Sequence, residues 1–380
     1  MRVSASRWQD GAWIDAPDSA LSGPRTLVLV FGASTYLDRP EPLHDVLSRF
    51  PDSVVMGCST AGEILGATIE DDTVTVAVTQ FDATDLRPAS AVMNGIGDSF
   101  DSGASIARQL QADDLRAVLV LSTGLEINGS ELVRGINSGL TSDVLVAGGL
   151  AGDGSAFRRT WAMDHDGPKE RLVAAVGFYG PNVRVGHGAR GGWTSFGPER
   201  LVTRSEGSTL YELDGERALT LYKEYLGDLA SGLPAAALRF PLALRESPVS
   251  DKYLVRTILA VDEDEQSLTF AGDLPQGWMA QLMRANFDEL VAGAEDAADV
   301  ASVEAIQDGL VIAISCVGRR LVLGETAEEE VEATLDRLPP GSTQIGFYSY
   351  GELSPFASGE CDLHNQTMTL LAIGEEPGPA

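Results

Sequence analysis

The sequence predicts an α+β fold, with two α/β-layered domains whose mixed, largely antiparallel sheets are flanked by helices. Apolar, β-rich runs recur along the whole chain, and amphipathic helical segments separate several of them. Other runs are joined by short turns, as in β-hairpins. This mixture favours α+β layers over a purely parallel, doubly wound sheet. A chain of 380 residues is too long for one ordinary core, so two domains are expected.

In the first half, residues 1–24 are polar and contain several prolines and glycines, so we expect a surface segment. Strands are then expected at 26–31, 54–56, 72–81, 117–121, 144–147 and 172–179. Helices are expected at 41–50, 99–111 and 130–140. The run 72–81 alternates with period two, which predicts a half-exposed antiparallel strand.

Residues 181–200 are dense in glycines and aromatics, and we place the transition between domains there, giving domains at 25–195 and 196–376. Further strands are expected at 242–244, 253–261 and 267–271, and in the apolar runs that begin at Gly309, Ile345 and Met368. Helices are expected at 218–226, 277–294 and 328–337.

The composition excludes several classes of partner. A formal charge of −29 repels nucleic acid phosphates and anionic lipids, so neither is an expected partner. The start of the chain lacks the apolar region of a signal peptide, and no window approaches 18 uninterrupted apolar residues. The three cysteines lack metal spacing, which favours a reducing compartment over a disulfide framework. We therefore expect a cytoplasmic protein without membrane contact.

Small and polar residues gather where several predicted strands end. The turns Gly57–Glu63 and Gly148–Asp153 share one plan, an apolar strand, small residues, Ala-Gly and an acid, which resembles an internal duplication. The match covers only about ten residues, so a chance likeness stays open. We expect both turns to meet two C-terminal strand ends in one ligand cleft. The candidate binding residues are Cys58, Ser59, Thr60, Glu63, Gly149, Asp153, Ser315, Cys316, Arg319, Tyr350, Glu352, His364, Asn365 and Thr367.

Several of these residues have alternative interpretations. Cys58 or Ser59 could act as the nucleophile of a hydrolase or transferase, but no histidine is near in sequence, and a small buried residue is the simpler interpretation. Glu63 and Asp153 could receive an ammonium group or cap a helix. Glu352 precedes a poor helix start, so binding is favoured there.

The four histidines, His44, His165, His187 and His364, have no zinc spacing, so no metal site is expected. His364 is the exception that we retain for ligand binding, because Asn365 and Thr367 surround it.

Four segments together resemble the FIST family (F-box and intracellular signal transduction proteins): 57–63, 148–153, 315–324 and 347–368. The chain would hold FIST N and FIST C domains in the usual order, over about residues 20–375. The resemblance implies a bacterial sensory protein without catalytic activity, which binds a small polar ligand such as an amino acid or related metabolite. Adjacent residues of an extended segment face opposite ways, so only one of Arg319 and Arg320 can point inward. The resemblance favours Arg319, whose guanidinium would bind the ligand carboxylate.

The resemblance also implies a separate signalling partner, such as a histidine kinase or a cyclic-dinucleotide enzyme. One branch of the family resembles haem-binding nitric-oxide sensors that control a partner kinase, so haem is the alternative ligand. Its axial ligand would be His364, His165, His187 or a cysteine.

Overall fold

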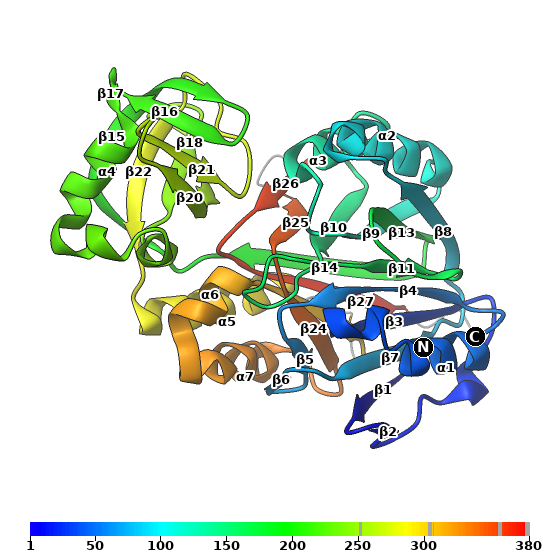
Figure 1. Ribbon diagram of the computed structural model, residues 1–380. Helices are drawn as coiled ribbons and strands as arrows, with labels where there is room; N and C mark the ends of the chain where they lie inside the picture. The colour runs from blue at the N-terminus through cyan, green and yellow to red at the C-terminus, as the bar shows by residue number, and fades with distance from the viewer. Residues whose placement is uncertain (251–252, 303–305, 307, 356–358, 377–380) are drawn as a thin grey trace.

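The computed structural model describes residues 1–250, 253–302, 306, 308–355 and 359–376. Four β-sheets with flanking helices make up the described chain, and the expected α+β class is confirmed (Figure 1). Three sheets are mixed, each with one parallel pair of strands, whereas the pairs of the eight-stranded sheet are antiparallel.

Three copies of one folding unit form the three mixed sheets. Each repeat has two parallel strands joined by a helical crossover, then a β-hairpin, then a return strand antiparallel to the first strand. Repeat 1 contains β3 (Thr26–Ala33), α1 (Glu41–Arg49), β4 (Val54–Thr60), β5 (Glu63–Leu65), β6 (Thr68–Glu70) and β7 (Val74–Gln80). Repeat 2 contains β9 (Leu115–Ser122), α3 (Gly129–Asn137), β10 (Leu145–Leu150), β11 (Ala162–Asp164), β12 (Gly167–Lys169) and β13 (Leu172–Tyr179). Repeat 3 contains β23 (Leu310–Cys316), α6 (Val317–Leu323), α7 (Ala327–Arg337), β24 (Thr343–Ser349), β25 (Gly351–Pro355), β26 (Cys361–His364) and β27 (Met368–Glu375).

An edge strand precedes each repeat and pairs antiparallel with its return strand. These edge strands are β1 (Arg2–Gln9), β8 (Asp85–Val92) and β14 (Val183–Arg190). The short β2 (Ala12–Trp13) extends the first sheet, and α2 (Ser99–Leu110) and α5 (Phe287–Ala301) lie between edge strand and repeat in the second and third units.

The hairpin of each repeat leaves its own sheet and joins that of another repeat. Strand β5 pairs with β24, β11 pairs with β4, and β25 pairs with β10. The exchange is cyclic, so every repeat both gives and receives a hairpin. The likeness between the turns at Gly57–Glu63 and Gly148–Asp153 is thus part of a threefold repetition of the fold.

A common apolar core fills the space between the three sheets. It takes side chains from all three repeats, among them Phe31, Leu119 and Ile314. The rings of Phe31 and Phe347, from repeats 1 and 3, have centroids 4.7 Å apart. Helices α2 and α3 cover the other face of the second sheet, and α5 and α7 that of the third. The central strands are therefore buried on both faces.

Residues 194–284, which we call the inserted lobe, interrupt the third unit between β14 and α5 (Figure 1, upper left). The lobe contains β15 (Thr194–Glu206), β16 (Thr209–Leu213), β17 (Glu216–Arg217), α4 (Ala218–Leu226), β18 (Leu242–Arg245), β19 (Leu254–Arg256), β20 (Ile258–Asp262), β21 (Ser267–Phe270) and β22 (Met279–Arg284). It has an apolar core of its own, with Val202, Leu244 and Leu268 fully buried.

Four expectations about the elements were wrong. Residues 277–294 are not one helix, because β22 comes first and α5 starts after Asn286, whose side chain accepts the Asp288 N–H. Residues 1–24 are not merely a surface segment, since β1 pairs with β7. Strand β7 is buried rather than half-exposed, because it lies between β1 and β3 with apolar cores on both faces. The chain after Cys316 is helix α6 rather than an extended segment.

The proposed division at residues 195/196 falls at the start of the inserted lobe. The sheets cross this division, because β5, β6 and β14 share a sheet with β23, β24 and β27. The two halves of the sequence are therefore interleaved in space.

Candidate functional site

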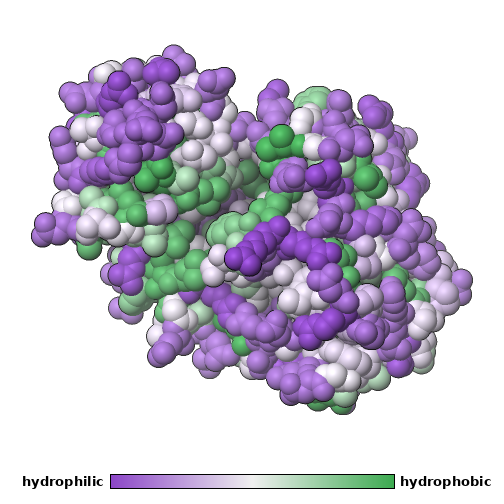
Figure 2. Space-filling view, viewed as in Figure 1, coloured by the Kyte–Doolittle hydropathy of each residue, from purple (hydrophilic) through white to green (hydrophobic). Residues whose placement is uncertain are grey.

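A cavity of about 230 Å³ lies between repeats 2 and 3 and the inserted lobe. Its floor is formed where the parallel strands β10, β23 and β24 end, at Leu150, Cys316 and Tyr350, and by the loop that follows β9. Figure 2 shows the hollow between the inserted lobe and the rest of the molecule, with hydrophobic side chains along its rim. Carboxyl ends of parallel strands are a common place for ligand sites.

Three of the four strand-end turns that we expected to converge, at 57–63, 148–153 and 349–352, are joined by backbone hydrogen bonds. The Tyr348 N–H donates to Gly62 O at 2.9 Å, the Gly152 N–H to Ser59 O at 3.0 Å, and the Tyr350 N–H to Leu150 O at 3.0 Å. Each of these hydrogen bonds joins two different repeats, so the cyclic hairpin exchange brings the strand ends together.

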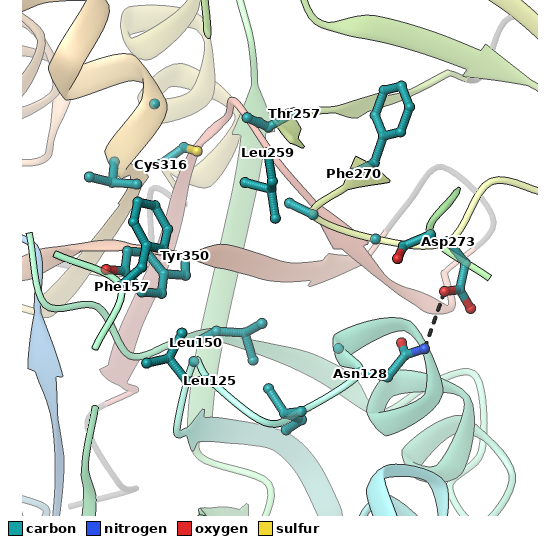
Figure 3. A pocket seen from close by; sticks show the side chains of 18 of the residues that line it. Leu125, Asn128, Leu150, Phe157, Thr257, Leu259, Phe270, Asp273, Cys316 and Tyr350 are labelled. Atoms are coloured by element: carbon teal, nitrogen blue, oxygen red, sulfur yellow. Dashed lines mark hydrogen bonds between the residues drawn. The ribbon is translucent and has the colours of Figure 1, made fainter. Parts of the chain in front are cut away.

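The cavity wall is mostly apolar. The aliphatic part includes Leu125, Leu150, Leu259, Val317 and Leu321, and Phe270 adds an aromatic ring (Figure 3). The expectation of a pocket lined by polar residues is therefore wrong for this cavity. An apolar wall of this kind holds the body of a ligand, and a few polar groups orient it.

Two stacked aromatic rings, those of Phe157 and Tyr350, close one side of the cavity. The rings of Phe157 and Tyr350 are 4.6 Å apart and nearly parallel, at 12°. The Asp153 carboxylate accepts the backbone N–H groups of Phe157, Arg158 and Arg159 at 2.7–2.9 Å, and the Tyr350 hydroxyl donates to the same carboxylate. Burial and this carboxylate raise the pKa of Tyr350, which stays a neutral donor. Asp153 thus supports the cavity wall.

Polar groups enter the cavity at a few points. Asn128 Nδ2 donates to Asp273 Oδ1 at 3.2 Å, and Asn128 Oδ1 caps α3 by accepting the Glu131 N–H (Figure 3). The hydroxyl of Thr257, a buried residue between β19 and β20, has no hydrogen-bond partner among the residues that the structure describes. Burial raises the pKa of Cys316 to about 12, so its sulfur is a thiol.

Two of the predicted site residues, Cys316 and Tyr350, line the cavity, and the others are used elsewhere. Glu352 is fully buried and accepts hydrogen bonds from Ser349 Oγ at 2.6 Å and from the N–H and Oγ1 of Thr367 at 3.2 and 2.9 Å. Glu63 is buried in the same way. It accepts from the Thr60 hydroxyl and from the N–H and Oγ1 of Thr73.

Glu63 and Glu352 occupy equivalent positions in repeats 1 and 3. Each carboxyl group ties the end of the second parallel strand to the start of the return strand, at a point where a hairpin crosses into another sheet. This equivalence indicates a structural role for both acids, in place of the expected contact of Glu352 with a ligand ammonium group.

Both acids are expected to make the protein less stable as the pH rises. Burial raises the pKa of Glu63 to about 7 and that of Glu352 to about 8, from an ordinary value of 4.5. The folded protein therefore keeps protons that the unfolded chain has released, and the free energy of unfolding falls between about pH 5 and the folded-state pKa values. Urea denaturation at several pH values should show this fall, and it should shrink in Glu63→Gln/Glu352→Gln. The exposed control Glu332→Gln should keep the wild-type slope; an unchanged slope in the double variant would contradict the role assigned to the two acids.

The expected role of Arg319 is wrong. Arg319 is fully buried in α6, and its guanidinium donates to Glu330 Oε2 at 2.7 and 3.0 Å and to Leu290 O at 2.8 Å. Its Nη1 donates to the backbone oxygens of Gly191 and Gln366. Ser315 belongs to the same network, since its hydroxyl donates to Glu330 Oε1 at 2.9 Å. No donor group of Arg319 is directed into the cavity.

The nucleophile proposed at Cys58 or Ser59 gains no support. Cys58 is fully buried, and burial raises the pKa of its thiol well above the ordinary value. Ser59 Oγ accepts the Trp161 N–H at 3.0 Å. Gly149 packs in the core, where a Cβ would lie 2.8 Å from Ile314. These residues form a tight, buried strand end, which agrees with the simpler interpretation that Cys58 is a small buried residue.

The histidines do not equip this cavity for haem. His364 is buried, with Nε2 3.2 Å from Ser354 O, and burial lowers its pKa to about 4. No histidine is among the residues that line the cavity, and the thiol of Cys316 resists deprotonation. Haem does not fit the described residues that line this cavity.

Asn365 also lies outside the wall, with both side-chain polar atoms buried and without a hydrogen bond in the described part of the chain.

The sequence analysis missed Asn128, Phe157, Thr257 and Asp273. One signal could have found Asp273, because Ala271-Gly272-Asp273 repeats the Ala-Gly-acid pattern of the turns at 61–63 and 151–153. The sequence Asn128-Gly-Ser-Glu131 also has the pattern of a helix start.

A mostly apolar cavity between a lobe and a repeat core, with a few inward polar groups, defines a small-molecule-binding class of protein. The FIST N domain matches residues 26–216 and the FIST C domain matches residues 218–355, so the chain belongs to the FIST family. FIST domains are associated with sensory signal transduction and small-ligand binding. No curated protein matches the chain. Among the described residues no helix is long and apolar enough to cross a bilayer.

Proposed function

We propose that this chain is a sensory protein that binds a small molecule in the cavity between repeats 2 and 3 and the inserted lobe. The observation that carries the proposal is the cavity itself, which three distant parts of the sequence build at the strand ends. Its volume of about 230 Å³ suits a molecule the size of an amino acid or related metabolite. The apolar wall favours a ligand with an apolar body, whereas the ligand first expected was a small polar molecule.

Ligand binding would act through the contact between the inserted lobe and the repeats. Thr257, Leu259 and Asp273 come from the lobe, whereas Leu125 and Tyr350 come from repeats 2 and 3. A ligand that touches both sides stabilises the arrangement in which they are close. A separate partner, such as a histidine kinase or a cyclic-dinucleotide enzyme, would recognise that arrangement.

Filling the cavity is expected to abolish ligand binding without unfolding the protein. Leu259 and Leu321 line the cavity but are 44% and 46% exposed, so a tryptophan at either position can occupy the cavity without disturbing the core. Leu259→Trp and Leu321→Trp should each weaken binding about tenfold or more, a loss of at least about 1.4 kcal/mol. Thermal-shift screening of a metabolite library, followed by calorimetry, measures the effect.

Leu229→Trp is the matched control. Leu229 is 54% exposed in the same lobe and is not part of the cavity wall. The control should bind as the wild type does. Equal ligand affinity in the control and both cavity variants would place the binding site elsewhere and refute the proposal.

A further inference from the structure

We infer that the ligand of this cavity is an amine with an apolar body and no carboxylate. The inference rests on the proposed function and narrows its ligand class. It departs from the amino acid that we first expected, because the arginine assigned to a ligand carboxylate is not in the cavity.

Among the described residues that line the cavity, Asp273 has the only charged side chain. Its Oδ1 accepts a hydrogen bond from Asn128, and its Oδ2 has no hydrogen-bond donor in the part of the chain that the structure describes. A ligand ammonium group can supply that donor and the opposite charge. The apolar wall around it strengthens this attraction, because charges interact more strongly where water is excluded.

A carboxylate on the ligand would find no matching cation. No lysine, arginine or histidine is part of the wall, and Asp273 would repel a second negative charge. Removing a carboxylate from water into an apolar site without a counter-charge is strongly unfavourable. An amino acid would meet this penalty, whereas the corresponding amine would not.

Arg256 is the cation that comes nearest to this role, and its Nε and Nη1 donate to backbone oxygens. It packs against Gly272, where a Cβ would lie 2.9 Å from Arg256 Nε. Nε donates to the backbone oxygen of Asp273 at 3.2 Å, and Nη1 donates to Leu363 O at 2.8 Å. Arg256 and Asp273 both line a second pocket of about 470 Å³, and the Arg256 charge also attracts the Asp273 carboxylate. Arg256 is buried and is not among the described residues that line the apolar cavity, so it offers no donor to a ligand there.

The rest of the ligand must be largely apolar. In the view of Figure 3, Asn128 and Asp273 lie on one side of the cavity and Phe157, Tyr350 and Cys316 on another, with leucines between them. An aromatic or branched aliphatic group would fill the space beyond the amine.

Four probes that share a phenylethyl skeleton test this inference: 2-phenylethylamine, L-phenylalanine, 3-phenylpropionate and 2-phenylethanol. Calorimetric titration of the wild type should give the tightest binding for the amine. Both carboxylate-bearing probes should bind about ten- to a hundredfold more weakly, the factor expected for one charge-assisted hydrogen bond. The alcohol should bind more weakly than the amine and more tightly than the two carboxylate-bearing probes.

Asp273→Asn is the decisive variant, because it removes the charge and keeps an oxygen for Asn128. It should weaken binding of the amine about ten- to a hundredfold and change binding of the alcohol little. Asp264→Asn removes a charge from an exposed turn of the same lobe and should change neither.

The possible outcomes separate this inference from the proposed function. Binding of phenylalanine as tightly as of the amine, or an unchanged amine affinity in Asp273→Asn, would overturn the amine inference. If the probes bind the wild type but not Leu259→Trp, the cavity is still the ligand site, and the proposed function stands even where the amine is not preferred. Failure of 2-phenylethylamine to bind the wild type would overturn the amine inference alone, because the proposed function is decided by the metabolite screen with Leu259→Trp and Leu321→Trp.

Discussion

Arg319→Met is expected to lower the free energy of unfolding by about 3–5 kcal/mol, the cost of leaving a buried partner charge uncompensated. Arg319 and Glu330 are both 0% exposed, and the carboxylate also accepts hydrogen bonds from Ser315 and Tyr348. Without the guanidinium, Glu330 would keep its hydroxyl donors and lose its counter-ion. Denaturation in urea, followed by circular dichroism, measures the change.

Two further variants separate charge from packing. Arg319→Met/Glu330→Leu removes both charges and should recover part of the lost stability, because a buried pair can be replaced by apolar groups at little net cost. Arg320→Met should cost less, about 1–2 kcal/mol, since Asp71 is 65% exposed and surface ion pairs contribute little, which leaves mainly the hydrogen bond from Arg320 to Ala61 O. A loss in Arg319→Met no larger than in Arg320→Met would contradict the structural role of this ion pair.

The sequence was sufficient for the fold class, for most strands and for the family. Runs such as those at 26–31 and 172–179 are apolar throughout, and strands buried on both faces need that composition. The turn motifs could also be recognised, because Gly and small residues are required where strands of different repeats pass close to one another. The turns at 57–63, 148–153 and 349–352 contact one another, but no residue of the first turn is among the described residues that line the cavity.

The role of each turn residue could not be predicted from the same pattern. An acid after a Gly turn is chemically fit to hold a ligand or to tie two strands together, and only the partners of Glu63 and Glu352 distinguish these uses. The main polar groups of the cavity come from the inserted lobe, whose position depends on tertiary packing. Local sequence carries no information on which surface of the lobe faces the repeats.

The segment after Cys316 shows why Arg319 was misassigned. Val317–Leu323 is short and rich in apolar residues, so a buried helix and an extended strand end have the same composition. In a strand, Arg319 and Arg320 would point to opposite faces. In α6 they are about 100° apart, and Arg319 reaches Glu330 in α7 while Arg320 reaches Asp71.

The threefold repeat predicts that three glycines are equally intolerant of a side chain. They occupy the second parallel strand of each repeat, each directly opposite a residue of the first strand: Gly57 opposite Val30, Gly148 opposite Val120 and Gly346 opposite Ala313. At each position a Cβ would overlap the backbone oxygen of the opposite residue. The parallel strands could accommodate it only by moving apart.

Gly57→Ala, Gly148→Ala and Gly346→Ala are therefore each expected to lower the free energy of unfolding by at least about 3 kcal/mol, at the upper end of what overpacking costs. Gly23→Ala is the control, because a Cβ there meets nothing within 4 Å, and its effect should stay within about 0.5 kcal/mol. Urea denaturation of the four variants measures these losses. One glycine that tolerates alanine as well as Gly23 does would show that the close strand contact is not shared by all three repeats. Three similar losses would show that each repeat depends on the same close approach of its parallel strands, which is the feature that sets the positions of the strand ends beneath the cavity.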